Sequence, residues 1–260
     1  MDLQLKEKVI LVTGGAKGIG AAIVRSSVAE GACPVVVDVD KEACDKLNGE
    51  LTRAGARCHF VHGQLTEVET CERCVTEAVQ QFGHLDALVN NAGVNDSVGL
   101  ENGSPPAYAR SLERNLLHYY NVAHFALPHL KKTAGSMVNI ASKTAVTGQG
   151  GTSGYVASKG AILALTREWA VELLPYRIRV NAVVPAEVET PLYQQWLSHF
   201  PDAKQKLAAI TAKIPLGRRM TTPAEIASTV LFLLSVQASH ITGQHIYVDG
   251  GYVHLDRALT

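Results

Sequence analysis

The sequence lacks the features that mark membrane, secreted and nucleic-acid-binding proteins. None of its apolar runs reaches the roughly 20 residues that a membrane span requires. The start, Met1-Asp2-Leu3-Gln4, has neither the basic residues nor the apolar core of a signal peptide. The 24 basic and 24 acidic side chains cancel, so no attraction to nucleic acid or to an anionic membrane is predicted. We therefore expect a cytoplasmic protein whose partners are small molecules.

Patterns of metal ligands and disulfides are also missing. The five cysteines are odd in number and lie in the first third of the chain, unlike the paired framework of a secreted protein. Cys71 and Cys74 form a lone C-x-x-C in a helical pattern, without the second pair that a zinc site needs, and we interpret them as structural. The ten histidines form no H-E-x-x-H motif, so no metal site is expected.

What the chain does contain is a regular alternation of strand and helix patterns. Nearly half of its 260 residues (47%) are apolar, enough for a large core in a single domain over 1–260. This alternation predicts an α/β fold: a Rossmann-type, doubly wound parallel sheet in a three-layer α/β/α arrangement. Strands are expected at 8–13, 34–38, 57–61, 85–89, 136–140, 179–184 and 245–248, and helices at 21–30, 41–54, 68–82, 106–132, 155–174 and 223–234.

Function is expected at the carboxyl ends of these strands, where such sheets bind ligands. Residues 1–135 are predicted to form mainly a cofactor half and residues 136–260 a catalytic half. Between 190 and 215, aromatic side chains stand among polar ones, which predicts a mobile helical lid. An aromatic stripe at helical spacing also suits simple packing.

A glycine-rich loop follows the first expected strand and precedes a helix. Its glycines, Gly14, Gly18 and Gly20, depart from the G-x-G-x-x-G spacing, so the prediction depends on their place between strand and helix. Bare backbone and unpaired helix N–H groups suit a dinucleotide pyrophosphate. Asp38, at the end of the second strand, can accept hydrogen bonds from a ribose and repel a 2′-phosphate, which favours NAD. Lys17 is a cation in the same loop, so NADP stays possible.

A serine, a tyrosine and a lysine of the middle third carry the candidate chemistry. Tyr155 and Lys159 are four residues apart in an expected helix and share one face. A lysine cation beside a phenol lowers the pKa of that phenol, which makes Tyr155 a candidate general acid/base. Ser142, at a strand end, can donate a hydrogen bond to a substrate oxygen. Asn115 lies inside a helical segment, where asparagine is unfavourable unless its side chain has a role. A Tyr/Lys pair alone would also suit an ordinary surface helix.

Together these residues resemble the short-chain dehydrogenase/reductase family over essentially the whole chain. The segment 13–20 is similar to the cofactor loop of that family and the segment 90–93 to its central turn. The resemblance implies a catalytic tetrad in which tyrosine exchanges the proton, lysine lowers the tyrosine pKa and binds the nicotinamide ribose, serine holds the substrate oxygen and asparagine positions a water. The matching residues here are Asn115, Ser142, Tyr155 and Lys159.

The resemblance and the strand-end positions also imply the cofactor contacts. Two positions depart from the family pattern: Gly63-Gln64-Leu65 stands where an acidic residue usually contacts adenine, and Pro185-Ala186-Glu187 replaces a usual proline-glycine. The expected cofactor-binding residues are Gly14, Lys17, Gly18, Ile19, Gly20, Asp38, Gln64, Leu65, Asn91, Ala92, Gly93, Tyr155, Lys159, Pro185, Val188 and Thr190.

Within the family, the segments 91–96, 111–115, 142–150, 185–188 and 249–257 are similar to bacterial L-fucose dehydrogenases. That resemblance implies NAD-dependent oxidation of an aldose at C1 to the lactone, with L-fucose, L-galactose or D-arabinose as substrate. Polar side chains near the site suit a substrate rich in hydroxyls, because an apolar one would leave them unsatisfied. The expected substrate-binding residues are Asn95, Ser142, Lys143, Gln149, Tyr155 and Glu187.

Two other functions remain open. A 3-oxoacyl thioester reductase, or another secondary-alcohol dehydrogenase of the same family, is the alternative activity, although the zero net charge and Asp38 oppose a carrier-protein substrate and NADPH. A nucleotide-binding regulator without catalysis is disfavoured because the tetrad is intact. The apolar segment 252–260 is expected to dock on a neighbouring subunit, and the resemblance implies a homotetramer.

Overall fold

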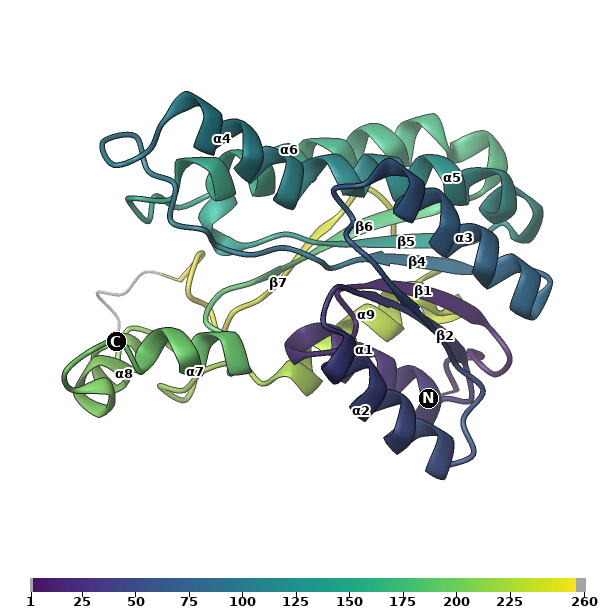
Figure 1. The fold of residues 1–260 in the computed structure, drawn as a ribbon, viewed down its shortest axis with the longest axis horizontal. Helices are drawn as coiled ribbons and strands as arrows, with labels where there is room; N and C mark the ends of the chain where they lie inside the picture. The colour runs from purple at the N-terminus through teal and green to yellow at the C-terminus, as the bar shows by residue number, and fades with distance from the viewer. Residues whose placement is uncertain (1, 256–260) are drawn as a thin grey trace.

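Short β-branched runs form the seven parallel strands of one sheet in the computed structural model, which describes residues 2–255 (Figure 1). The strand order is β3-β2-β1-β4-β5-β6-β7, and the direction of winding reverses between β1 and β4. The strands are β1 Val9–Thr13, β2 Cys33–Asp38, β3 His59–His62, β4 Ala87–Asn90, β5 Ser136–Ile140, β6 Arg179–Pro185 and β7 His245–Val248.

Helices cover both faces of this sheet, as Figure 1 shows. Neighbouring residues of a strand point to opposite faces, so Val9 and Leu11 of β1 join one core cluster while Ile10 and Val12 join the other. The first cluster packs against α3 Val68–Phe82, α5 His118–Thr133 and α6 Ser153–Glu172; the second packs against α1 Gly18–Ala29, α2 Lys41–Arg53 and α9 Pro223–Leu234. The predicted three-layer, doubly wound single domain is confirmed.

The expected helix 106–132 is wrong as one continuous α-helix. It consists of α4 Pro105–Leu112, a π-helical turn Glu113–Leu117 and α5. The buried Asn115 lies in the π turn, where its Nδ2 donates to Ser111 O at 3.1 Å. Single π turns often mark functional sites, because they re-aim one side chain without ending the helix.

Other boundaries differ by up to three residues, the largest difference being at the first helix, expected from 21 and observed from Gly18. The expected helix 155–174 begins earlier, at Ser153, and ends at Glu172, before a 3₁₀ turn Leu174–Tyr176. The expected strand 57–61 lies at His59–His62. Cys71 and Cys74 are buried in α3, and burial raises the pKa of their thiols to about 11 and about 12. Such thiols are unreactive at neutral pH, which agrees with a structural role.

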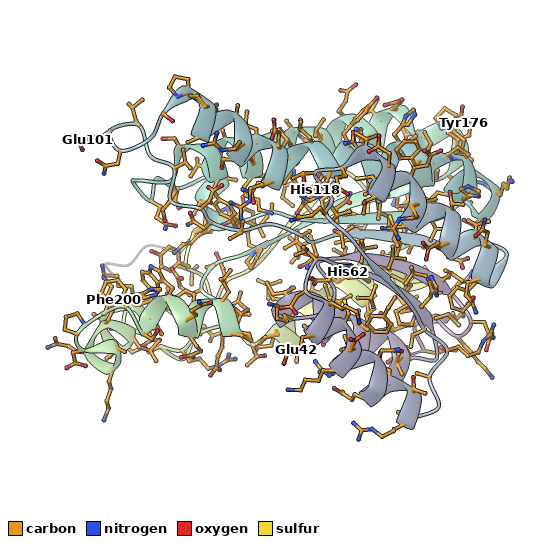
Figure 2. The ribbon with its side chains drawn as sticks, in the orientation of Figure 1. Glu42, His62, Glu101, His118, Tyr176 and Phe200 are labelled. Atoms are coloured by element: carbon orange, nitrogen blue, oxygen red, sulfur yellow. The ribbon has the colours of Figure 1, made fainter. Side chains whose placement is uncertain are left out.

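The expected lid contains two short helices, α7 Pro191–Leu197 and α8 Ala203–Thr211, which extend away from the sheet at the left of Figure 1. Its aromatic rings pack on one another: the Trp196 ring centroid lies 5.2 Å from that of Tyr193 and 4.8 Å from that of Phe200. Figure 2 shows Phe200 on this projecting segment. The alternative interpretation of the stripe, as packing, therefore holds for these three rings.

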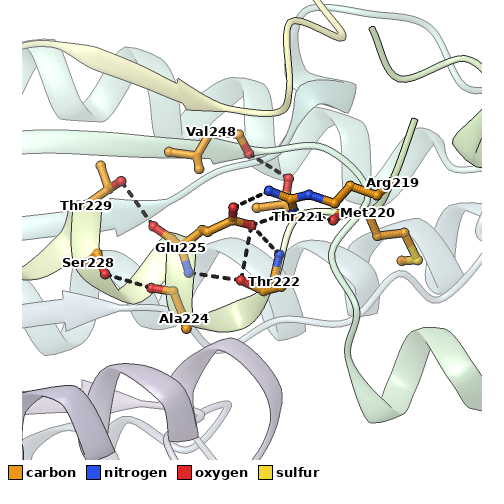
Figure 3. A network of polar contacts seen from close by, with 9 residues as sticks. All are labelled: Arg219, Met220, Thr221, Thr222, Ala224, Glu225, Ser228, Thr229 and Val248. Carbon is orange, nitrogen blue, oxygen red and sulfur yellow. Dashed lines mark hydrogen bonds and ion pairs between the residues drawn. The ribbon is translucent and has the colours of Figure 1, made fainter. Parts of the chain in front are cut away.

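The chain returns from the lid through a fixed polar network at the start of α9 (Figure 3). Thr222 and Glu225 form a capping box, in which Glu225 N donates to Thr222 Oγ1 at 3.3 Å and Thr222 N donates to Glu225 Oε2 at 2.8 Å. Arg219 forms an ion pair with Glu225, and Thr221 Oγ1 donates to Val248 O of β7 at 3.4 Å. The end of the lid is thereby tied to the sheet. Within residues 2–255 no helix combines the length and apolar composition needed to span a membrane.

Candidate active site

The parallel strands bring the candidate residues to one edge of the sheet. The register pairs Thr13 of β1 with Val37 of β2, and Asn90 of β4 with Asn139 of β5. The residues that follow these strands, from the glycine loop to Ser142, therefore stand side by side. This confirms the predicted convergence at the carboxyl ends of the strands.

The glycine loop is locked to the turn after β4. Asn91 Nδ2 donates to both Thr13 O and Gly14 O at 3.0 Å, and Thr13 Oγ1 accepts from Asn91 N at 2.9 Å. A Cβ atom added to Gly20 would lie only 2.0 Å from Gly14 O, so this close approach requires glycine. The prediction that amides hold the turn rigid is confirmed.

The first turn of α1 has the properties of a phosphate site. Lys17 at its N-cap makes no side-chain capping hydrogen bond, so its side chain does not occupy the N–H groups of the first turn. Gly18 adopts a φ of +54°, a left-handed conformation that glycine reaches without strain. A cavity of about 400 Å³ lies beside this turn, bounded by Lys17, Gly18, Asp40 and Pro191 among others.

Asp38 presents a buried carboxylate at the end of β2. Its Oδ2 accepts from Ala16 N and its Oδ1 from Asp40 N, both at 3.0 Å. A carboxylate has about four acceptor sites, so Asp38 can accept further hydrogen bonds from ribose hydroxyls. Lys17 Nζ donates to Asp40 Oδ2 at 2.6 Å, so that carboxylate already pairs with the cation of the loop. The loop and Asp38 together fit a dinucleotide.

The remaining predicted cofactor residues take different positions around this edge. Thr190 caps α7 by accepting from Tyr193 N at 3.2 Å, and its methyl group lies beside Gly18. Pro185 ends β6, and the buried Val188 forms a bridge with Thr221. Gln64 is exposed, and Leu65 packs partly against the core.

Ser142 and Tyr155 are hydrogen-bonded to each other, and this bond favours the phenolate. Ser142 also accepts from Thr144 Oγ1 at 3.0 Å, which fixes its side chain in the loop after β5. Burial nevertheless raises the pKa of Tyr155 to about 12, because the phenolate loses hydration. Burial likewise lowers the pKa of Lys159 to about 7. Burial thus raises the pKa of Tyr155 overall, and the expectation that Lys159 lowers it stays a prediction.

The Lys159 ammonium is fully buried among three elements. Its Nζ donates to Ile140 O at 2.7 Å and to the Tyr119 hydroxyl at 3.0 Å, and it lies 5.6 Å from the centroid of the Tyr155 ring. Sequence reasoning did not identify Tyr119. Tyr119 lies four residues after Asn115, and this spacing places both on one face of a helix. Spacing alone does not show that the Tyr119 hydroxyl contacts Lys159.

Asn115 links the π turn to the segment that follows β4. Its Oδ1 accepts from Val94 N at 2.7 Å. A Cβ atom added to Gly93 would lie 3.1 Å from Asn115 Oδ1 and 3.5 Å from Lys159 Nζ, so both side chains border Gly93. The structure thus brings the four predicted catalytic side chains together.

A second polar cluster lies directly after Ser142. Lys143 forms an ion pair with Glu187, and their side chains are only 10% and 15% exposed. Tyr193 of α7 donates a hydrogen bond to Glu187, and burial, followed by the negative charge and hydrogen bond of Glu187, raises the pKa of this phenol. Lys143 Nζ also lies 4.1 Å from the centroid of the Tyr252 ring. Sequence reasoning predicted Lys143 and Glu187 but missed Tyr193 and Tyr252.

The other two predicted substrate residues stand apart from this cluster. Asn95 and Gln149 have exposed side chains in their loops, and Asn95 Oδ1 accepts a local bond from Ser97 N at 3.2 Å. Of the expected docking segment 252–260, only residues up to 255 are described, and 256–260 lie outside the described residues.

The fold and the site define an oxidoreductase that acts on CH–OH groups. The chain belongs to the short-chain dehydrogenase/reductase family, whose members use NAD(P) nucleotides. A family model described as Enoyl-(Acyl carrier protein) reductase matches residues 14–253. The chain is 38% identical to L-fucose dehydrogenase of Rattus norvegicus over 245 residues, 94% of this chain and 88% of that one.

Two further comparisons place the chain among related enzymes. It is 35% identical to 3-oxoacyl-[acyl-carrier-protein] reductase FabG of Thermotoga maritima, over 96% of this chain and 100% of that one. The crystal structure of Cj0485 dehydrogenase matches with a TM-score of 0.94 and 46% sequence identity, covering 100% of this chain and 99% of that one.

Proposed function

We propose that the protein oxidises an aldose at C1 to the lactone with NAD. The substrate is L-fucose or a sugar that shares its stereochemistry, such as L-galactose or D-arabinose. The observation that carries this proposal is the largely buried Lys143–Glu187 pair beside Ser142. Charged donors and acceptors at a substrate site suit hydroxyl groups, whereas an apolar substrate would cover them without replacing their hydration. The 38% identity to an L-fucose dehydrogenase supports the same assignment.

The side chains divide the chemistry between them. A bound nicotinamide accepts the hydride that leaves C1. Tyr155 removes the proton of the anomeric hydroxyl, and Ser142, whose hydrogen bond to Tyr155 favours the phenolate, donates to the same oxygen as the C1=O bond forms. Lys159, held by Ile140 O at 2.7 Å, keeps a positive charge close to Tyr155.

The nucleotide end of the site supports NAD. A 2′-phosphate would meet the buried Asp38 carboxylate, which repels it. The cation able to compensate, Lys17, already donates to Asp40 Oδ2 at 2.6 Å. Neutral ribose hydroxyls face no such repulsion, so the acidic pair Asp38 and Asp40 selects against NADP.

A 3-oxoacyl thioester reductase is the second candidate, favoured by the 35% identity to FabG of Thermotoga maritima. One assay separates the two activities: formation of reduced nicotinamide with L-fucose, L-galactose, D-arabinose, other aldoses and simple alcohols, with NAD and NADP compared. We expect the highest kcat/KM with one of the three named sugars and NAD. Efficient reduction of an acyl thioester with NADPH, and no turnover of any aldose, would overturn the proposal.

We also propose that the protein acts as a homotetramer. Apolar side chains on the helical layer support an interface there: Leu117 is 50% exposed and Tyr120 of α5 is 55% exposed. Light scattering of the purified protein measures the mass directly. A monomeric mass at micromolar concentration would contradict this assembly.

A further inference from the structure

A second tyrosine occupies the centre of the candidate active site. Tyr119 of α5 is fully buried, and its hydroxyl donates to Ile140 O at 2.9 Å. The same hydroxyl accepts from Lys159 Nζ at 3.0 Å, while Lys159 donates to Ile140 O at 2.7 Å. The three polar atoms form a closed triangle between α5, the end of β5 and α6. Figure 2 shows the neighbouring residue, His118, in the interior of the molecule between the helices and the sheet.

A buried tyrosine needs only one acceptor for its hydroxyl, and Ile140 O already provides it. The hydroxyl oxygen of Tyr119 is therefore available as an acceptor for the Lys159 ammonium. An ammonium has three N–H donors, and two of them are directed to Tyr119 and Ile140. The Nζ atom lies 5.1 Å from the Tyr119 ring centroid and 5.6 Å from the Tyr155 ring centroid. This geometry holds the cation between the two phenols, with one donor left for the reacting groups.

We propose that Tyr119 is a positioning residue for Lys159: its hydroxyl fixes the ammonium beside Tyr155 and stabilises its charged form. This inference rests on the proposed function, in which Tyr155 exchanges a proton with the substrate. Tyr119 itself transfers no proton, because burial raises its pKa well above the ordinary value and keeps it a phenol.

The groups around Lys159 allow the direction of the effect to be worked out. Tyr155 faces it from α6, and Tyr119 and His118 face it from α5. Burial lowers the pKa of His118 to about 4, so this imidazole is neutral at pH 7. Further along the loop after β5, the charge of Lys143 is balanced by Glu187. Among His118, Tyr119, Tyr155 and Lys159, Lys159 is the group whose pKa lies near 7.

Burial already lowers the pKa of Lys159 to about 7. Removing an acceptor from the ammonium disfavours its charged form further, so the pKa of Lys159 falls. A less populated cation stabilises the Tyr155 phenolate less. The fraction of enzyme that holds a Tyr155 phenolate beside the Lys159 ammonium therefore falls at and above neutral pH.

The test is Tyr119→Phe, which removes the hydroxyl and keeps the ring. We expect kcat for sugar oxidation to fall by about tenfold at and above neutral pH, because the ammonium that stabilises the phenolate is less populated. The KM for the sugar should change by less than about twofold, because Tyr119 does not contact the substrate. The matched control is Tyr108→Phe, at an exposed tyrosine of α4, and its profile should match that of the wild type. A lower Tm for Tyr119→Phe with an unchanged pH profile would show a purely structural role and overturn the inference.

A second measurement is independent of the substrate. Protein labelled with ¹³C at the lysine ε-carbons reports the titration of Lys159 by NMR, with its signal assigned by its loss in Lys159→Met. We expect the midpoint for Lys159 to be lower by about one pH unit in Tyr119→Phe than in the wild type. If this shift occurs in a protein that oxidises no alcohol, the proposed function fails and the positioning role stands. If the enzyme is active and neither the midpoint nor the profile moves, the positioning role fails.

Discussion

Lys143 and Glu187 form a largely buried ion pair directly beside Ser142, with side chains 10% and 15% exposed. They come from the loop after β5 and the turn after β6, and Tyr193 of the lid donates a hydrogen bond to the same carboxylate. The pair thereby connects the candidate catalytic serine to α7 of the expected lid.

Replacing Glu187 tests whether this pair binds sugar hydroxyls. Glu187→Gln keeps the size of the side chain but removes its charge, so KM for the aldose should rise tenfold or more, about the worth of a charged hydrogen bond. Turnover of a simple cyclic alcohol should change much less. Steady-state kinetics with both substrates gives the comparison, and the exposed Glu189→Gln is the matched control.

The single variant also leaves Lys143 without its counter-charge, which lowers stability. The double variant Lys143→Gln/Glu187→Gln removes both charges and should recover most of the lost Tm without recovering sugar affinity. Equal losses of kcat/KM for the sugar and the cyclic alcohol would remove the pair from the specificity site.

Tyr155→Phe tests the proton acceptor. Since the phenol oxygen takes the proton, kcat should fall by about 10³-fold, within the range found for general acid–base groups. NAD affinity, measured by calorimetry, should change little. Tyr176→Phe, at a tyrosine that is 42% exposed, serves as the control. A Tyr155→Phe variant that keeps near-normal rates would mean that another group accepts the proton.

The pH dependence of the two reaction directions should be opposite. Burial raises the pKa of Tyr155 to about 12, so the phenol is the resting form at neutral pH. Oxidation requires the phenolate, and its rate should increase with pH; reduction of the lactone requires the phenol, and its rate should decrease as pH rises. Rate profiles in both directions check this, and two parallel profiles would argue against Tyr155 as the shared acid/base.

Cofactor choice should depend on the residue that holds Lys17. Asp40→Ser releases the Lys17 ammonium, and serine can still cap α2, because Asp40 is its N-cap. The ratio of kcat/KM for NADP to that for NAD should therefore increase, by about tenfold for one added charge contact, and more in Asp38→Ser/Asp40→Ser. Asp45→Asn, which alters the exposed pair with Lys41, should leave the ratio unchanged. An unchanged ratio in the double variant would show that other residues select the nucleotide.

Much of the fold follows from local patterns. The runs Ser136–Ile140 and His245–Val248 are observed with the predicted ends, and so are the helices Val68–Phe82 and Pro223–Leu234. Continuous apolar strands and helical periodicity are properties of the chain itself, so a parallel sheet with two helical layers could be inferred without tertiary information.

The features that were not predicted depend on hydrogen-bond partners that are distant in the sequence. The π turn at Asn115 goes with a hydrogen bond from Val94 N, which helical periodicity does not contain. No role was predicted for Tyr119, and Tyr193 was expected only as part of an aromatic stripe, because spacing does not reveal which hydroxyl reaches Lys159 or Glu187. The pKa of Tyr155 depends on the depth of burial, and a sequence reveals only its neighbours.

Direct transfer of hydrogen from C1 of the sugar tests the central claim most closely. L-fucose deuterated at C1 is incubated with the protein and NAD, and the reduced nucleotide and the sugar product are analysed by mass spectrometry. The account predicts one deuterium in the reduced nucleotide, a lactone as product and a slower rate than with unlabelled sugar. Reduced nucleotide without deuterium, or no reaction with any C1-labelled aldose while an acyl thioester is reduced, would contradict it.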